Sequence, residues 1–212
     1  MDPLFAAYLT FTAVLVLTPG ATTVVVVRNT LKGGRLAGFA AALGAATGNA
    51  SHATAAGLGL AIVFARWPPA MSGLRLCGAA YLGWLGGRSV YRVVKYRDGG
   101  RQLVDSGGRP RRAKQPNRGG SFRQGVVVNL LNPAIATFYL VVVPSFLPSG
   151  ATAWSFAGLA AVHIAMALAC HALWAIGLDQ ARRLCLSPGP KRALEGVTGI
   201  ALVILALRIL AN

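Results

Sequence analysis

The chain has 212 residues, of which 55% are hydrophobic and only 12% are charged, and its mean hydropathy is +0.57. Charged residues make up about 25% of an ordinary soluble domain, so this composition excludes a soluble globular protein. The net charge of +16 does not indicate nucleic-acid binding, because the Lys and Arg residues fall between apolar runs rather than along one face; basic loops beside a membrane explain it more simply.

Six apolar runs approach or exceed the roughly 20 residues that a helix needs to cross a hydrocarbon core about 30 Å thick. The third and sixth are the weakest, because Arg75 and Arg208 lie near their outer ends, and we expect both side chains to reach the membrane interface. The sequence therefore predicts an all-α membrane protein with six transmembrane helices. The expected spans are residues 4–27, 36–64, 69–87, 124–147, 152–178 and 194–210.

The segment between the third and fourth runs, residues 96–121, is rich in Gly, Arg and Pro and has little apolar content. Such a composition cannot bury enough apolar surface to fold by itself, so we expect a basic cytoplasmic linker. Binding of anionic lipid at the cytoplasmic surface is the alternative. The linker divides the chain into two halves, residues 1–95 and 122–212, each with three spans.

Two of the runs are interrupted by proline in the middle of the expected span, the first at Pro19 and the fourth at Pro133. Proline removes a backbone donor and breaks the helix, which leaves free carbonyls before the break and free amides after it. Two such breaks in corresponding halves are typical of the substrate site of a transporter. We therefore predict substrate-binding positions at Thr18, Pro19, Gly20, Thr22, Thr23, Asn129, Asn132 and Pro133.

The N-terminus of each half-helix carries partial positive charge and would seat a substrate carboxylate, with threonine hydroxyls and asparagine amides as further partners. The alternative is a pair of kinked helices whose threonine hydroxyls bond back to the carbonyls four residues earlier. Matched breaks in both halves favour the functional interpretation. Residues 114 positions apart in the two halves also correspond: Pro19 and Pro133, Gly44 and Gly158, and Asn49 and His163. Because each half has three spans, the second half enters the membrane in the opposite direction, which predicts an inverted repeat.

Polar side chains also occur within the second and fifth runs. Asn49 and His52 are three residues apart and share a helix face, and His163 and His171 are two turns apart. No acidic residue falls in the interior of a run, since Asp179 and Glu195 lie at the ends of the fifth and sixth, so histidine is the group there that titrates near neutral pH. We expect Asn49, His52 and His163 to form a polar core, with His52 and His163 carrying any proton coupling and His171 packing. The alternative is that all three histidines only bond across helices.

Metal binding and catalysis are not expected. The three cysteines, Cys77, Cys170 and Cys185, form no CxxC motif, and the histidines match no metal-ligand spacing. No Ser-His-acid arrangement or HExxH motif is present. The sequence therefore predicts a protein that is not an enzyme and that uses no cofactor.

Several motifs resemble those of the LysE/RhtB family of amino-acid exporters. The first and fourth runs carry the most specific ones, and together the motifs cover nearly the whole chain apart from residues 96–121. They lie at residues 18–20 (TPG), 28–35 (RNTLKGGR), 37–38 (AG), 43–48 (LGAATG), 78–82 (GAAYL), 84–86 (WLG), 122–125 (FRQG), 129–133 (NLLNP), 144–146 (PSF) and 198–199 (TG).

The resemblance implies a six-span protein of the cytoplasmic (inner) membrane that exports an amino acid or a derivative of one, is driven by the proton gradient, and often forms a homodimer. Three positions depart from the family pattern. Ala21 replaces the second proline of Pro-Gly-Pro, Asn49 stands where an acidic residue is common, and Ala134 stands where lysine often follows Asn-Pro. The missing carboxylate and lysine affect which residue could couple transport to protons and which charge the substrate could carry.

Three other functions are alternatives to amino-acid export for a chain with these spans. A thiol-disulfide electron carrier also uses two three-span halves, but it needs a reactive cysteine near each break, and none of the cysteines lies there. A heavy-metal efflux protein of the wider superfamily would need cysteine or carboxylate ligands within the spans, which offer few. A purely structural membrane protein would not explain the matched breaks. The expected partners are therefore an amino-acid solute, the lipid bilayer and a second copy of the chain, with no nucleic acid.

Orientation follows from the basic residues, since 18 of the 21 Lys and Arg residues lie in the loops after the first, third and fifth runs. Positive loops remain in the cytoplasm, so both termini are expected outside; no cleavable signal peptide is expected, because the N-terminus lacks a basic region. We predict that a reporter inserted at Gly108 is cytoplasmic, as measured by protection from membrane-impermeable reagents. Labelling of Gly108 from outside intact cells would contradict this orientation.

Overall fold

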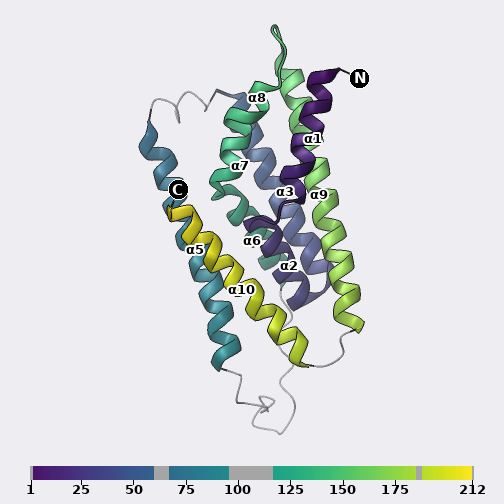
Figure 1. Cartoon of the computed structure of the whole chain (residues 1–212), viewed down its shortest axis with the longest axis vertical. Coiled ribbons are helices and arrows are strands. Elements are labelled where there is room, and N and C mark those ends of the chain that lie inside the picture. The colour runs from purple at the N-terminus through teal and green to yellow at the C-terminus, as the bar shows by residue number, and fades with distance from the viewer. Residues whose placement is uncertain (1, 60–66, 96–116, 185–187, 212) are drawn as a thin grey trace.

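The computed structural model describes residues 2–59, 67–95, 117–184 and 188–211, and every regular element among them is a helix (Figure 1). The all-α class predicted from the sequence is confirmed for this part of the chain. Most of the expected linker (96–116) and the end of the second run (60–64) lie outside the described residues. The helices are α1 (Pro3–Leu17), α2 (Ala21–Gly33), α3 (Arg35–Gly57), α5 (Pro68–Lys95), α6 (Arg118–Leu130), α7 (Pro133–Thr137), the π-helix η1 (Phe138–Val142), α8 (Val143–Ser145), α9 (Ala153–Leu184) and α10 (Pro188–Ala211).

Among the described residues, one helix is long and apolar enough to cross a membrane alone, namely α9 over Ala153–Ala181. Two more spans are formed if each bent pair is counted as one: α1 with α2, bent by 47°, and α6 with Pro133–Ser145, bent by 57°. The apolar part of α10, Gly196–Ala211, is shorter. The two bent pairs are the runs in which proline predicted a break.

The expectation that no acidic residue lies within a span is wrong for α9. The fifth run was expected to end at residue 178, but the helix continues to Leu184, and its apolar segment contains Asp179, whose side chain is only 3% exposed. The physical reason is that the end of an apolar run is not the end of a helix, since no proline or glycine follows residue 178 until Pro188. For the same reason α5 continues well past residue 87, to Lys95.

The first break is built from three residues between α1 and α2. Thr18 caps the C-terminus of α1, and Gly20, in an extended conformation, precedes the first turn of α2. The second break has Asn132 as the N-cap of α7 and Pro133 as its first residue, where the fixed φ of proline suits a helix start and its missing N–H is not needed. Proline therefore occurs at both breaks, between the two helices at Pro19 and as the first residue of the second helix at Pro133.

Small residues bring α3 against α6. A Cβ placed on Gly44 would collide with the Phe122 carbonyl, and one on Gly125 would collide with the Ala41 carbonyl, so the two backbones are in direct contact. Such close approach is how helices associate where lipid removes the hydrophobic drive between them. Gly158, the expected repeat counterpart of Gly44, has nothing within 4 Å of its Cβ position, so the two glycines have different surroundings.

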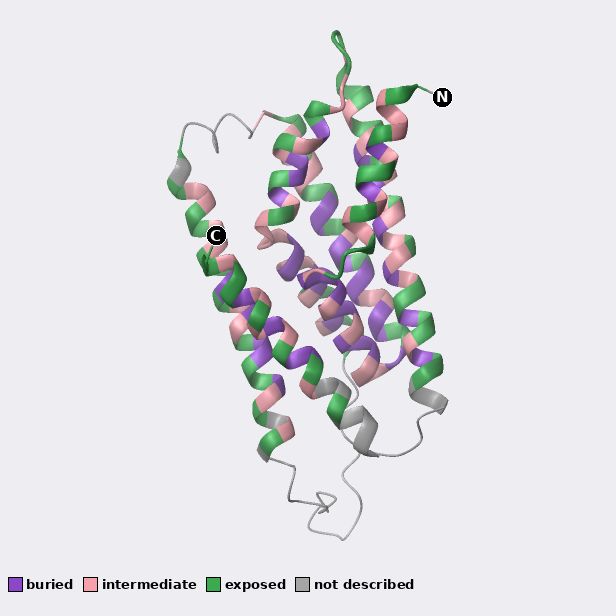
Figure 2. Cartoon of the chain, in the orientation of Figure 1, coloured by how far each residue is buried: buried purple, intermediate pink, exposed green. Residues whose placement is uncertain are grey.

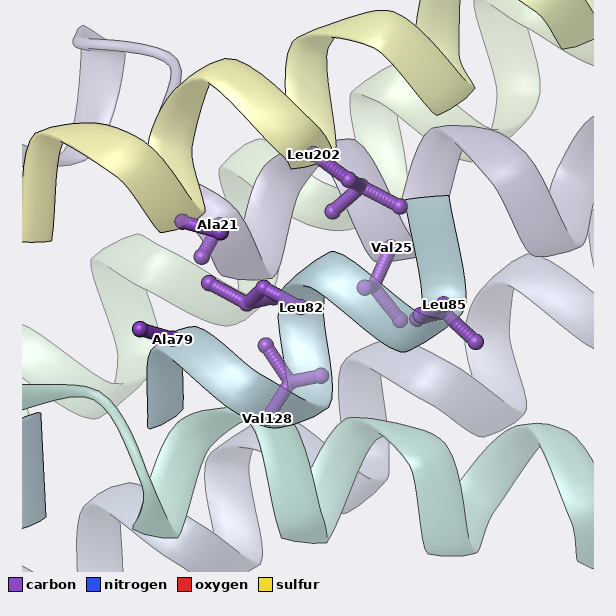
Figure 3. Packing of buried hydrophobic residues seen from close by; sticks show 8 residues of the cluster. Ala21, Val25, Ala79, Leu82, Leu85, Val128 and Leu202 are labelled. Carbon is purple, nitrogen blue, oxygen red and sulfur yellow. The ribbon is translucent and has the colours of Figure 1, made fainter. Parts of the chain in front are cut away.

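The helices α5 and α10 run side by side along one flank of the bundle (Figure 1). They meet at Gly86, whose Cβ position is 2.6 Å from the Gly199 carbonyl oxygen. One hydrophobic cluster fixes this pair to α2 and α6 (Figure 3), and buried residues concentrate in the middle of the bundle, where α2, α3 and α6 meet (Figure 2). The cluster consists of Ala21, Val25, Ala79, Leu82, Leu85, Val128, Leu202 and Ala206.

The unequal surroundings of Gly44 and Gly158 give a matched test of this packing. Gly44→Ala is expected to lower the free energy of unfolding by about 1–3 kcal/mol, because the new methyl group forces α3 away from α6. Gly158→Ala is expected to leave it unchanged or to raise it by about 0.5–1 kcal/mol, because alanine is the better helix former. Thermal unfolding of the purified protein in detergent measures both, and equal effects of the two substitutions would contradict the α3–α6 contact.

Candidate functional site

A cavity of about 570 Å³ lies between the two broken helices. Ligand sites for small molecules typically have roughly 300–1,000 Å³. The wall includes parts of α1, α3, α5, α9, α10 and η1 as well as both breaks. Every position that the sequence predicted to bind substrate lines this one cavity, namely Thr18, Pro19, Gly20, Thr22, Thr23, Asn129, Asn132 and Pro133. Asn49 and His163 of the predicted polar core line it too, whereas His52 is not among the lining residues.

The N-terminus of α2 opens into the cavity without a side-chain cap. Gly20 holds the N-cap position and has no side chain to accept from the first amides of the helix. Thr22, in the first turn, is 7% exposed, and its hydroxyl has no hydrogen-bond partner. A buried polar group without a partner is costly, so this hydroxyl and the nearby amides form an unfilled set of hydrogen-bonding groups.

The three threonines at this break behave differently. The Thr18 hydroxyl donates to the Val14 carbonyl at 2.7 Å, which is the back-bonded arrangement of an ordinary kinked helix. The Thr23 hydroxyl lies 3.4 Å from Nε2 of His171. Thr22 is therefore the threonine of the break whose hydroxyl has no hydrogen-bond partner in the part of the chain that the structure describes.

The second break is already satisfied from within the chain. The Asn132 side chain accepts a hydrogen bond from the Ala134 amide at 3.1 Å, so the start of α7 is capped. Asn129 Nδ2 donates to Asn49 Oδ1 at 2.9 Å across the α3–α6 contact. Asn129 Oδ1, in contrast, is buried against Gly48 of α3 and has no hydrogen-bond partner among the described residues. The unfilled group of the second break therefore lies within the α3–α6 contact, whereas those of the first break lie at the start of α2.

Aromatic side chains lie beside His163: Phe138 lines the cavity, whereas Tyr139 is fully buried and is not among the lining residues. The Tyr139 hydroxyl is 2.7 Å from His163 Nδ1, and the ring centroids of Phe138 and His163 are 4.4 Å apart. Both aromatic residues lie in η1, the wider helical turn just before Pro144, which has no N–H to give to the preceding turn. Sequence reasoning missed Phe138 and Tyr139, although Pro144 inside an apolar run was a signal that the helix there is irregular.

The three histidines occupy different positions. His163 and His171 both line the cavity from α9. The His52 ring instead lies 3.2 Å from the Asn129 backbone carbonyl, which also accepts from the Asn132 amide at 3.0 Å. Among the described residues, no group of three His, Cys, Asp or Glu side chains is placed to hold a metal ion.

Two arginines line the cavity, Arg75 from α5 and Arg208 from α10. Both side chains were expected at the membrane interface from their places near the ends of apolar runs. The signal that could have identified them is their position inside otherwise apolar runs, because an ionisable residue within a span is by default a functional candidate.

A third arginine belongs to a polar network on the other side of the hydrophobic cluster. Arg28 is 4% exposed, and its guanidinium donates to Ser89 Oγ at 2.9 Å and to Gln124 Oε1 at 3.2 Å. Asn29 Nδ2 donates to the same Gln124 oxygen at 3.1 Å. The network ties α2 to α5 and α6.

Comparison with known proteins gives a family and several relatives. The family of LysE type translocators matches residues 13–212. The chain is 30% identical to the uncharacterized membrane protein YrhP of Bacillus subtilis (strain 168), over 93% of each chain, and 30% identical to the uncharacterized membrane protein YahN of Escherichia coli (strain K12), over 95% of this chain and 84% of that one. It is also 30% identical to a homoserine/homoserine lactone efflux protein of Salmonella typhimurium (strain LT2), over 66% of this chain and 63% of the relative. No solved structure matches it significantly.

Proposed function

The chain belongs to the family of LysE type translocators, and from this premise we propose that it exports an amino acid or a small amino-acid derivative across the cytoplasmic membrane, coupled to protons. The observation that carries the proposal is that both helix breaks open into one cavity of suitable size. The similarity to a homoserine/homoserine lactone efflux protein supports outward transport of such a solute.

We propose that the chain crosses the membrane six times, as two inverted three-helix halves with both termini outside. The two bent helix pairs support the repeat, because each half then begins with a broken span. The concentration of basic residues in three loops supports the orientation. A homodimer embedded in the lipid bilayer is the assembly proposed for the working protein.

In the proposed site the solute carboxylate accepts hydrogen bonds from the first amides of α2 and from the Thr22 hydroxyl. This arrangement supplies partners to groups that are otherwise unfilled, and the partial positive charge of the helix N-terminus favours an anion there. Phe138 and the neighbouring apolar wall take the side chain of the solute.

The export activity and its dependence on the breaks can be tested together. Cells loaded with labelled amino acids are expected to release one class of solute faster with the protein than without it. Pro19→Ala and Pro133→Ala are each expected to abolish this release, because a continuous helix removes the free backbone groups at the breaks. Thr22→Val is expected to weaken it about tenfold or more, since a hydrogen bond to a charged group is lost.

Thr18→Val is the matched control for Thr22→Val, because the Thr18 hydroxyl is bonded back within its own helix. It is expected to export at close to the normal rate. The amount of each variant in the membrane fraction measures its membrane insertion. This amount must equal that of the unchanged protein. Normal export by both proline variants would contradict a substrate site at the breaks.

For proton coupling we propose the cavity histidines, His163 and His171, ahead of His52. Histidine is the side chain that gains and loses protons near neutral pH, and a coupling group must reach the same space as the solute. Two observations support this order. His163 and His171 line the cavity, whereas the His52 ring bonds to a backbone carbonyl. The sequence alone predicted that His52 and His163 carry proton coupling, so His52 remains the third residue to be tested.

We expect His163→Gln and His171→Gln to reduce export driven by an imposed proton gradient, while His52→Gln retains the response. The measurement is efflux from proteoliposomes with and without an uncoupler. A triple variant that still transports and still responds to the uncoupler would show that the histidines are structural. The solute gradient alone would then have to be tested as the driving force.

A further inference from the structure

The imidazole of His163 lies between the cavity and a buried tyrosine. Its side chain is 1% exposed and lines the cavity, whereas Tyr139 is fully buried and does not. The Tyr139 hydroxyl is 2.7 Å from Nδ1, and the Phe138 ring lies beside the same imidazole, with 4.4 Å between the ring centroids. The edge of the imidazole that carries Nδ1 therefore faces away from the cavity, and the edge that carries Nε2 is left to face it.

The direction of the hydrogen bond between Tyr139 and His163 follows from the burial of the hydroxyl. A buried hydroxyl donates its hydrogen to an acceptor, and Nδ1 is the acceptor that the Tyr139 hydroxyl reaches in the part of the chain that the structure describes. A ring nitrogen accepts a hydrogen bond only if it carries no hydrogen itself. In the neutral imidazole the hydrogen is therefore on Nε2, so His163 presents an N–H donor and no lone pair to the cavity.

The π-helix η1 supplies both neighbours of this imidazole. Phe138 and Tyr139 are its first two residues, and both contact His163. Consecutive side chains of an α-helix point about 100° apart, and the wider turn of a π-helix makes this angle smaller. Such turns are rare and frequently mark functional sites. The irregular turn before Pro144 thus places two successive aromatic side chains around one ring.

Other titratable side chains face this region from the surrounding helices, but none of them forms a printed bond to His163 among the described residues. Tyr8 of α1 donates to the Leu159 carbonyl at 2.6 Å. The Nδ1 contact with Tyr139 is therefore the hydrogen bond that fixes the state of the His163 ring. The titratable and charged side chains considered are Tyr8 of α1, His52 of α3, His171 of α9, Arg75 of α5 and Arg208 of α10.

Building on the proposed export function, we propose that Tyr139 is a positioning residue that holds His163 in the form with its hydrogen on Nε2. His163 then meets the solute as a neutral donor to one of its oxygen atoms. A proton cannot add to Nε2, which already carries its hydrogen, so it adds to Nδ1, and the bond from Tyr139 breaks first. The resulting imidazolium has two N–H donors, and the hydroxyl of Tyr139, once rotated, accepts from one of them. Proton uptake by His163 is thereby tied to a change at Tyr139.

The state of the ring can be measured by solid-state NMR on the full chain in proteoliposomes, with histidine labelled with the heavy nitrogen isotope. The chain has three histidines, and the spectrum of His163→Gln identifies which signals belong to His163. We expect Nε2 to carry the hydrogen and Nδ1 to be an unprotonated, hydrogen-bonded nitrogen. In Tyr139→Phe the Nδ1 signal is expected to move to the position of a nitrogen without a hydrogen bond. A hydrogen on Nδ1 in the unchanged protein would overturn the proposal.

Tyr8→Phe is the matched control for Tyr139→Phe. It also removes one hydroxyl from a fully buried tyrosine of the same aromatic cluster, but that hydroxyl bonds to the Leu159 carbonyl. Each variant loses one buried hydrogen bond, so both are expected to lose similar thermal stability in detergent. The NMR signals of His163 are expected to stay unchanged in Tyr8→Phe, and a shift equal to that in Tyr139→Phe would contradict the specific role of Tyr139.

Proton entry into proteoliposomes under an imposed pH gradient, with no solute added, measures the consequence for coupling. Tyr139→Phe is expected to raise it about threefold or more, because a hydrogen bond no longer has to break before His163 takes up a proton. Tyr8→Phe is expected to leave it unchanged. Equal proton entry by the two variants, in a protein that does export, would show that Tyr139 only packs against the ring.

These measurements separate the inference from the proposed function. The position of the hydrogen on His163 is a property of the resting protein, so the NMR result stands or fails whether or not a solute is moved. Export is tested by the release of labelled amino acids from loaded cells. Absence of release there, with the expected NMR signals, would overturn the exporter and leave the Tyr139–His163 bond as described.

Discussion

The backbone at the two helix breaks sets the constraint on which the rest of the structure depends. A helix satisfies its own N–H and C=O groups, but a break leaves several of them without partners, and lipid offers none. Irregular backbone at that depth is tolerated only where it lines a cavity or is buried in protein. Both breaks of this chain line one cavity, so the bundle is arranged to place Pro19 and Pro133 on the same internal space.

The polar groups at the two breaks find hydrogen-bond partners within the chain to different extents. At the second, Asn132 caps the following helix and the Asn129 amide nitrogen bonds to Asn49, so most polar groups are satisfied within the chain. At the first, glycine provides no cap and the Thr22 hydroxyl has no partner. An inverted repeat would make the breaks equivalent in position, but the side chains around them make α2 the end that can accept a ligand. The different surroundings of Gly44 and Gly158 point to the same divergence between the halves.

Close helix contacts make this arrangement rigid on one side of the cavity. Glycines bring α3 onto α6 and α5 onto α10, and the hydrophobic cluster joins the second pair to α2 and α6. Beyond that cluster, the buried guanidinium of Arg28 bridges Ser89 and Gln124. These bonds tie α2 to α5 and α6.

The sequence by itself determined the helical class and the two breaks, because proline, glycine and apolar run length act locally. It did not determine where apolar helices end, so Asp179 was placed outside a span that includes it. Only the tertiary structure decided which side chains share the cavity. His52 and His163 are equally plausible by spacing along the chain, yet one bonds to the backbone of α6 and the other lines the cavity. Arg75 and Arg208 face it for the same reason: the rotation of each helix about its axis is fixed by packing against distant segments, which no local pattern records.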